Sequence, residues 1–430
     1  MKRRRNPGSG KGRVLMVASV ASMIDQFNLP NIRLLQRMGY EVHVACNFKE
    51  GNTCDEKRLR DLKKKLRDLH VIPHQWDCPR SIVSVRKCCR AYVQLSKLAA
   101  RIRFDWMHCH SPVGGALARM AAHRYAVPVM YTAHGFHFYK GAPLRNWLLY
   151  YPAEKLLACW TDVLVTVNRE DYGLAKRRLR AGRVYRIPGV GVDPACIRVS
   201  GQKKDPAALR RKYGIPDKAL LLLSVGELSR RKNHEAVLRA LALLAAEDSA
   251  GREEVCYLVC GQGVLEKKLA RQADRYGVGG QVRLAGFVED VAPVYQAADI
   301  FVFPSYQEGM PVALMEAMAA GMPCVVSDIR GNRELIGRKE LRFAPDSPGQ
   351  LAERLADLIR CKQERREACG ARNREKIRAY SLEEVQKRMT CIYAEFRDGT
   401  AVRRQKGVLP CRSRHRPGTR GMDFISGFFC

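Results

Sequence analysis

The sequence of 430 residues predicts an α/β protein with two doubly wound, Rossmann-like domains that face a cleft. Apolar runs of strand length alternate with helical patterns, which indicates parallel strands joined by crossover helices. This series stops at a polar, proline-containing segment, 196–218, and then starts again, so that segment is expected to be a linker. A chain of this length also exceeds what one hydrophobic core usually organises, which favours two domains of roughly 200 residues each.

The first domain is expected at residues 11–195, after a basic N-terminal extension at 1–10. Its predicted strands are the apolar runs that begin at Val14, Val42, Asp105, Val129, Val163 and Val184. The helical patterns between these runs predict helices that cover both faces of a parallel sheet. Such sheets bind ligands outside the carboxyl ends of their strands, so candidate site residues are sought directly after each strand.

The second domain is expected at residues 219–380. Its predicted strands lie in the runs ALLLLSVGEL, VCYLVCGQG, QVRLAGF, DIFVFPS and MPCVVSD. A helical pattern at 381–397 is expected to pack back on the first domain. Residues 398–430 are basic, contain Gly, Pro and Ser and lack periodicity, which predicts a disordered tail.

The formal net charge is +33, and residues 1–200 hold +22 of it. Part of this charge lies on 57–69, where leucines at helical spacing leave a basic face outward, and part lies on 86–103. Such clusters attract anionic lipid headgroups by about 1 kcal/mol per Lys or Arg. We therefore expect a cytoplasmic protein that is peripheral on the inner, anionic face of the cell membrane. The alternative is an ordinary solvated basic surface.

The N-terminus has the outline of a secretory signal, but its apolar run also opens a βαβ pattern that cleavage would destroy. The scattered cysteines match no zinc or disulfide framework and favour a reducing compartment. No run reaches the about 18 apolar residues that a membrane-spanning helix needs. His108 and His110 share one face of a predicted strand but have no further ligand nearby in sequence, so no metal site is expected.

The segment 305–332 is the most informative part of the sequence, because Glu308 and Glu316 stand eight positions apart around a helix start. The strand run 300–304 leads into Glu308, and Pro311 stands where a helix would take its first residue. An open helix start offers unpaired N–H groups and a partial positive charge to a phosphate. Flanking carboxylates can accept hydrogen bonds from sugar hydroxyls. The pattern therefore predicts a nucleotide-sugar site.

This segment resembles the E-x7-E signature of the retaining glycosyltransferases of family 4, over about fifty residues from GFVEDV to SDIRGNRELI. The segments HGFHFY and GELSRRKN are similar to those of bacterial capsular and exopolysaccharide transferases. The resemblance implies the GT-B fold and a metal-independent hexosyltransferase without a cofactor. Its co-substrate would be a nucleotide sugar, expected to be UDP-linked, held by the second domain. The first domain would hold a glycan or a polyprenyl-diphosphate-linked acceptor.

The resemblance implies three catalytic residues, His134, Glu308 and Lys232. His134 follows a predicted strand and would close the pocket on the donor sugar, whereas Lys232 would offset charge on the leaving diphosphate. Glu227 stands where the family commonly has an arginine, and Arg231 is the candidate substitute. The implied donor-binding residues are Glu316, Arg231, Gly309, Met310, Pro311, Val312, Leu314 and Gly226.

These residues predict a retaining glycosyltransferase of cell-surface polysaccharide synthesis. A sugar-nucleotide epimerase or a phosphorylase of the same architecture is the alternative among enzymes. A basic nucleic-acid-binding protein is the alternative from another class, although no nucleic-acid module is recognisable and no nucleic-acid partner is expected. The aromatic segment 142–160 is expected to pack in the core, with a path for a polyprenyl carrier as its alternative.

Overall fold

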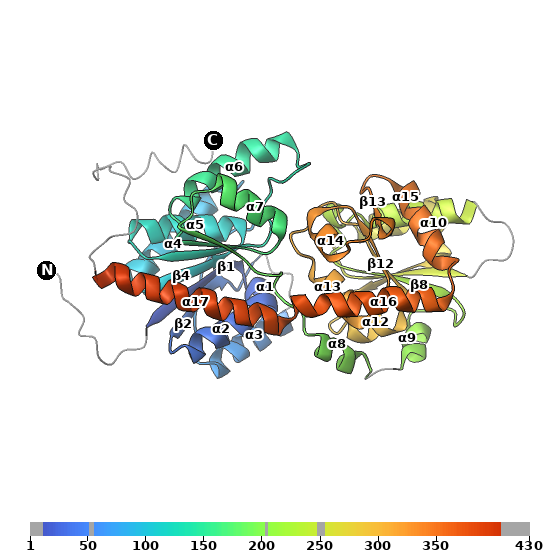
Figure 1. Cartoon of the computed structure of the whole chain (residues 1–430), viewed down its shortest axis with the longest axis horizontal. Coiled ribbons are helices and arrows are strands. Elements are labelled where there is room, and N and C mark those ends of the chain that lie inside the picture. Colours follow the sequence, from blue (N-terminus) through green and yellow to red (C-terminus); the bar gives the residue numbers. More distant parts are fainter. Residues whose placement is uncertain (1–11, 51–55, 203–204, 247–253, 406–430) are drawn as a thin grey trace. The chain divides into compact units, whose positions relative to one another are not determined.

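The computed structural model describes residues 12–50, 56–202, 205–246 and 254–405 (Figure 1). The chain divides into two compact units: one ends at Ile187 and is completed by the chain from Gln386, and the other is Pro188–Val385. Each unit is built around a parallel sheet flanked by helices, so the predicted fold class is confirmed. The expected extension at 1–10 and residues 406–430 of the expected tail lie outside the described residues.

The first unit contains a seven-stranded sheet in the order β3-β2-β1-β4-β5-β6-β7, and all its strand pairs are parallel. The strands are β1 Arg13–Val20, β2 Glu41–Asn47, β3 Ile72–Gln75, β4 Trp106–His110, β5 Val129–Ala133, β6 Val163–Thr166 and β7 Arg183–Arg186. The central strands β4 and β5 are buried throughout, and β4 buries His108 and His110 together with its apolar residues. The sequence did not predict β3, because this edge strand is short, largely exposed and contains Pro73.

The helices of the first unit follow its strands in a βα alternation. They are α1 Ala21–Met23, the π-helical turn η1 Ile24–Asn28, α2 Leu29–Arg37, α3 Glu56–Asp68, α4 Val85–Arg101, α5 Pro112–Arg124, α6 Leu144–Ala158 and α7 Arg169–Arg178. The helix α5 packs against both α4 and α6. In the basic helix α3, Leu62 and Leu66 are buried while the lysines face solvent, as the leucine spacing predicted.

The aromatic segment 142–160 is only partly in the core. Within α6, Trp147, Tyr150 and Tyr151 pack against the buried cluster of the first unit. However, Leu144 and Leu148 on the same helix are 73% and 71% exposed. The expectation of core packing is therefore wrong for these leucines, because the mixed spacing in this helix directs them to solvent.

The last helix, α17 Leu382–Gln405 (red in Figure 1), belongs to the first unit from Gln386 onward. Its Tyr393 and Phe396 rings pack against Trp106 of β4. The expected disorder from residue 398 is wrong as far as Gln405, because the helix continues. A helix that is already anchored by packing propagates at little cost, and no proline interrupts the sequence there.

The second unit contains a six-stranded parallel sheet in the order β10-β9-β8-β11-β12-β13. Its strands are β8 Leu220–Val225, β9 Val255–Cys260, β10 Val282–Gly286, β11 Ile300–Phe303, β12 Cys324–Ser327 and β13 Arg342–Phe343. Its α-helices are α8 Pro194–Gly201, α9 Pro206–Lys212, α10 His234–Ala246, α11 Glu266–Arg275, α12 Ala292–Ala297, α13 Val312–Ala320, α14 Arg330–Leu335, α15 Pro348–Ile359 and α16 Gln363–Ile377. The 3-10 turns are η2 Arg230–Lys232, η3 Gly279–Gln281, η4 Lys339–Leu341 and η5 Arg378–Tyr380.

The expected linker, 196–218, is instead part of the second unit. It carries most of α8 and all of α9, which both pack against α12. Asp193 and Asp205 cap these helices through their carboxylates, and each is followed by a proline in the first turn. This Asp-Pro pair is a helix-start signal, and the polar composition of the segment concealed it.

No helix among the described residues is both long enough and apolar enough to cross a lipid bilayer.

Candidate active site

The predicted site residues of the second unit lie at the carboxyl ends of the neighbouring strands β8 and β11. Gly226 directly follows β8, and Lys232 ends the 3-10 turn η2 a few residues later. Glu308 follows β11 in the loop that leads to α13. Because β8 and β11 are adjacent and parallel, both loops emerge at the same edge of the sheet.

Glu308 is held between two cationic side chains. Its Oε1 atom lies 2.9 Å from Nζ of Lys232 and 2.7 Å from a terminal guanidinium nitrogen of Arg231. Burial by itself would raise the pKa of Glu308, but the charges of Lys232 and Arg231 outweigh burial and lower it. Glu308 is therefore a carboxylate at neutral pH, and the three groups together carry one net positive charge.

The side chain of Lys232 is 13% exposed, and its path is defined by neighbouring residues. Its Nζ atom lies 4.7 Å from the centre of the Phe303 ring. A Cβ atom at Gly226 would come within 3.1 Å of Cε of Lys232, so a side chain there would displace the lysine. Arg231 is 45% exposed and also donates a hydrogen bond to the Gln307 carbonyl oxygen.

The helix α13 begins at Val312, and Pro311 is its N-cap rather than its first residue. No side chain caps this end, so the first N–H groups of the helix remain available to a ligand. The loop before the helix is tightly packed: a Cβ at Gly331 would lie 2.5 Å from the Gly309 carbonyl oxygen, and Met310 is 9% exposed. Arg330 donates a hydrogen bond of 3.2 Å to the Glu308 carbonyl oxygen, which fixes this loop from the β12 side.

Leu314 lies in the core with no exposed surface, so its side chain does not contact a ligand. The side chain of Glu316, two positions further, lies near the hydroxyl of Tyr295, which is 3.0 Å from Oε2. Burial raises the pKa of Glu316 to about 7, and the hydrogen bond from Tyr295 limits that rise. Glu316 is thus a carboxyl group that changes its charge near neutral pH.

His134 lies in the first unit, directly after β5, whereas the other predicted site residues lie in the second unit. Its Nε2 atom is 3.1 Å from Nδ1 of His110, the last residue of β4. Burial lowers the pKa of His134 to about 4, so the imidazole is neutral at physiological pH. Ser111, the residue after His110, has φ 66° and ψ 151°, a conformation that non-glycine residues rarely adopt and that clusters at functional sites.

Sequence reasoning missed three contributors to these sites: Tyr295, Arg330 and His110. Arg330 lies shortly after β12, in the segment SDIRGNRELI that resembles the family. Its place after a strand could therefore have marked it as a site residue. Tyr295 belongs to a buried helix, and its role depends only on its contact with Glu316. The pairing of His110 with His134 joins two strand ends that are 24 positions apart.

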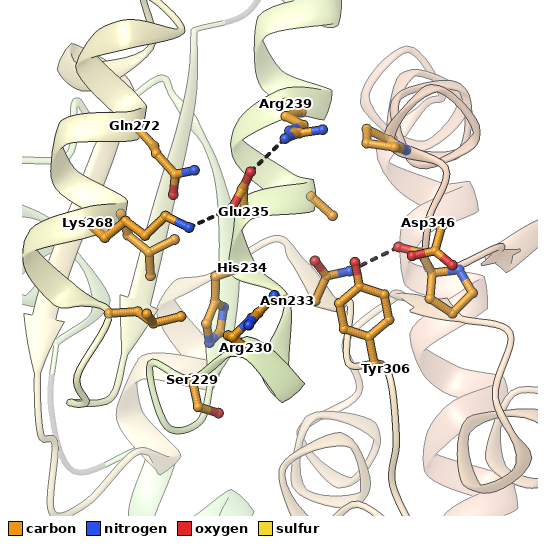
Figure 2. Close-up of a pocket in the computed structure, with 15 residues that line it drawn as sticks. Ser229, Arg230, Asn233, His234, Glu235, Arg239, Lys268, Gln272, Tyr306 and Asp346 are labelled. Atoms are coloured by element: carbon orange, nitrogen blue, oxygen red, sulfur yellow. Dashed lines mark hydrogen bonds and ion pairs between the residues drawn. The ribbon is translucent and has the colours of Figure 1, made fainter. Parts of the chain in front are cut away.

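A polar cavity of about 280 Å³ lies on the other side of η2, between the first turns of α10, the helix α11 and the loop before α15 (Figure 2). Charged side chains that line this cavity form ion pairs with one another: Glu235 contacts Arg239 at 2.7 Å and Lys268 at 3.7 Å. Asn233 donates hydrogen bonds to the carbonyl oxygens of Pro304 and Pro345 and thereby holds the cavity floor. None of the predicted site residues lines this cavity.

Comparison with known proteins identifies the family of this chain. The chain matches the family models Glycosyltransferase Family 4 over residues 32–195 and Glycosyl transferases group 1 over residues 205–376. The Bacillus subtilis protein that carries the name glycosyltransferase EpsD is 34% identical over 396 residues, which are 90% of this chain and 97% of that protein. An Escherichia coli UDP-Gal:alpha-D-GlcNAc-diphosphoundecaprenol alpha-1,3-galactosyltransferase is 31% identical over 260 residues, 59% of this chain and 65% of that enzyme.

Solved structures share the fold at low identity. HepE of Anabaena in complex with UDP and glucose has a TM-score of 0.70 and 16% identity, over 89% of this chain and 100% of HepE. WaaG, a glycosyltransferase involved in lipopolysaccharide biosynthesis, has a TM-score of 0.67 and 19% identity, over 88% of this chain and 99% of WaaG. From the two matched models and a relative aligned over nearly its whole length, this chain belongs to the family 4 glycosyltransferases with the GT-B fold.

Proposed function

We propose that this protein is a retaining hexosyltransferase that moves a sugar from a nucleotide sugar, UDP-linked, to a glycan or a polyprenyl-diphosphate-linked acceptor. One observation carries the proposal: Lys232 and Arg231 are held against Glu308 beside the uncapped start of α13. This edge of the second sheet offers two cations and free helix N–H groups, which suit a diphosphate. The family commonly has an arginine at the position of Glu227, and in this protein Arg231 would supply that positive charge instead.

The ribose end of the donor would bind at Glu316, whose carboxylate accepts hydrogen bonds from vicinal hydroxyls. The backbone N–H groups from Gly309 to Leu314 would hold the sugar and its phosphate, with Met310, Pro311 and Val312 between them. The structures of HepE are described with UDP, with UDP and glucose and with UDP-glucose, which supports UDP as the nucleotide.

The chemistry proposed is a displacement on the front face of the sugar. The bond between the anomeric carbon and the diphosphate oxygen breaks while the acceptor oxygen bonds to the same face, and the acceptor proton passes to the departing phosphate oxygen. Lys232 and Arg231 would stabilise the negative charge that grows on this phosphate, so the reaction needs neither a metal ion nor a dedicated protein base. His134 would contact the sugar from the first unit, and domain closure would bring it there.

The acceptor and the process are proposed from the relatives. The Escherichia coli relative acts, by its name, on a sugar linked to diphosphoundecaprenol, which supports a lipid-diphosphate acceptor. The name of WaaG assigns it to lipopolysaccharide biosynthesis, which supports a role in cell-surface polysaccharide synthesis.

A membrane docking surface would serve such an acceptor. We define it as the exposed basic side chains of α4, which include Arg86, Lys87 and Arg90, together with Leu144 and Leu148 of α6. Both helices flank α5 in the first unit. Basic groups would meet anionic headgroups while the leucines enter the boundary of the acyl chains.

The test is to incubate the protein with a panel of nucleotide sugars and measure release of the nucleoside diphosphate with and without a polyprenyl-diphosphate-linked sugar. We expect release from a UDP-sugar that requires the acceptor, and a product whose anomeric configuration by NMR equals that of the donor. Release that requires inorganic phosphate would indicate a phosphorylase instead, and conversion of the donor without any acceptor would indicate an epimerase.

A matched pair of variants ties the activity to the proposed site. Lys232→Ala should lower release strongly, whereas Lys218→Ala, which changes an exposed lysine before β8 at the opposite, amino end of the strands, should leave it unchanged. Equal activity of both variants would refute the assignment of the site.

A further inference from the structure

Three histidines lie close together in the first unit, two on β4 and one directly after β5. His108 and His110 are 0% and 1% exposed, and their rings lie 4.2 Å apart. His108 is fully engaged: its Nδ1 atom lies 2.9 Å from the Tyr393 hydroxyl and its Nε2 atom lies 2.8 Å from the Thr132 hydroxyl. The other two, His110 and His134, form a separate pair through Nδ1 and Nε2.

The sulfur atom of Met16 determines which nitrogen of His110 carries the proton. Nε2 of His110 lies 3.2 Å from Sδ of Met16, which has lone pairs and no hydrogen to donate. A favourable contact at this distance requires an N–H group on Nε2, because two lone pairs would repel each other. A neutral imidazole has only one N–H, so Nδ1 of His110 must be the acceptor.

The same reasoning extends to His134. Its Nε2 atom lies 3.1 Å from the acceptor Nδ1 of His110, so it must donate an N–H there. We propose that Met16 and His110 form a relay that fixes His134 as the Nε2–H tautomer, so that its Nδ1 lone pair accepts a hydrogen bond from a hydroxyl of the donor sugar. His110 is thus a positioning residue that acts through His134.

Two further observations support the relay. Burial lowers the pKa of His110 well below its ordinary value, with a further contribution from the neighbouring histidines, and burial lowers the pKa of His134 to about 4. Both rings are therefore neutral at neutral pH, and a neutral pair is what the relay needs. The strained residue Ser111 directly follows His110, and its hydroxyl lies 2.7 Å from that of Ser19, so this strand end is held firmly.

In this relay Nε2 of His134 is used by His110, so Nδ1 is the ring nitrogen that remains to bind a ligand. Among the described residues, no hydrogen bond reaches Nδ1 of His134, and the residue is only partly buried. A lone pair at this position selects a ligand that donates, such as a sugar hydroxyl, and disfavours an anionic oxygen. The assignment of that ligand rests on the proposed function, whereas the tautomer itself does not.

The direct test is NMR of protein labelled with ¹⁵N-histidine, in which long-range proton couplings distinguish the two neutral tautomers. The signals of the ten histidines are assigned from His110→Asn and His134→Asn. We expect the Nε2–H tautomer for both His110 and His134 in the free enzyme at pH 7. The Nδ1–H tautomer at either residue would overturn the relay, whether or not the protein transfers a sugar.

Variants connect the relay to turnover. His110→Leu removes the acceptor and should lower kcat/KM by about tenfold to hundredfold, as expected when a reacting group is mispositioned. His110→Asn offers a carbonyl oxygen near the place of Nδ1 and should recover most of that loss. Met16→Leu conserves volume, so folding should persist while the tautomer signal of His110 becomes mixed.

A matched control is available within the same sheet. His74 pairs with His43 through Nε2 and Nδ1 at 2.9 Å, and this pair lies on the edge strand β3 and its neighbour β2. His74→Leu should leave kcat/KM unchanged. If His74→Leu and His110→Leu lower kcat/KM equally, or if His110→Asn is as impaired as His110→Leu, the effect is one of folding and the positioning role is refuted.

Discussion

The Nζ atom of Lys232 lies 2.9 Å from a carboxylate oxygen of Glu308, although the two residues belong to loops after different strands. The same oxygen also contacts Arg231 at 2.7 Å. Glu308 therefore holds two cations in place without cancelling their combined charge. This is a pre-organised arrangement for a leaving group that gains negative charge during the reaction.

Replacing Lys232 by Met should lower kcat by about a hundredfold to a thousandfold, the usual effect of removing one group that stabilises transition-state charge. The affinity for UDP should change much less, because Arg231 and the α13 amides remain. Steady-state kinetics together with calorimetric titration of UDP separate the two quantities. A variant with wild-type kcat, or one that loses only UDP affinity, would contradict the role of Lys232.

We expect the stability of the protein to depend on pH through Glu316, and the substitution Glu316→Gln to remove this dependence. Its pKa rises on folding from the ordinary value of 4.5 to about 7 because it is buried. Between these pH values the folded chain retains a proton that the unfolded chain has lost, so the free energy of unfolding decreases as pH rises through this window. The decrease is about 1.4 kcal/mol per unit of pKa shift. Glu316→Gln should abolish it.

Urea unfolding of the wild type and of Glu316→Gln at pH 5 and pH 8 measures this difference. Donor binding provides a second measurement of this titration, because ribose hydroxyls bind the carboxylate form of Glu316 better than its protonated form. UDP affinity of the wild type should fall as pH decreases below about 7, and the affinity of Glu316→Gln should be weaker and flat with pH. Parallel pH profiles for the two proteins would show that this carboxyl group does not titrate as inferred.

Gly226→Ala should impair catalysis without unfolding the protein. The added Cβ would lie 3.1 Å from Cε and 3.4 Å from Nζ of Lys232, so the flexible lysine side chain must move away from Glu308. Gly277→Ala is the control, since a Cβ there meets no atom within 4 Å and Gly277, like Gly226, has a positive φ that alanine rarely adopts. Thermal unfolding should be similar for both variants, while kcat should fall for Gly226→Ala alone. Unchanged kcat in Gly226→Ala would mean that the position of Lys232 is not critical.

Treatment with EDTA should leave the transfer rate unchanged, because Lys232 and Arg231 supply the positive charge that a divalent cation provides in other enzymes. The rate is measured before chelation, after chelation and after addition of Mg²⁺ or Mn²⁺. Loss of activity on chelation with recovery on adding either ion would refute metal independence.

Membrane association should depend on both lipid charge and the exposed leucines of α6. The protein should float with vesicles of phosphatidylglycerol and not with vesicles of phosphatidylcholine, and salt should weaken binding because it screens the charges. The double variant Leu144→Ser/Leu148→Ser should bind less. Val264→Ser, which changes a 93% exposed residue of the second unit, is the matched control. Equal flotation of the two variants would exclude α6 from the docking surface.

Much of the fold followed from local patterns. Apolar runs of strand length predicted β1, β4, β5, β8 and β11, because strands buried on both faces are rich in apolar residues. The spacing of Glu308 and Glu316 around a helix start was equally local. The short edge strand β3 and the helices α8 and α9 were missed, because polar residues and prolines dominate them while packing and capping stabilise them.

The sequence by itself determined the two βα series, the open start of α13 and the presence of Glu308, Lys232 and His134 at strand ends. Only the tertiary structure decided how these groups behave. The pKa of Glu316 depends on burial beside Tyr295, 21 positions away, and the inferred tautomer of His134 depends on Met16, 94 positions from His110. Such properties arise from contacts between distant segments, and no local pattern in one sequence encodes which segments meet.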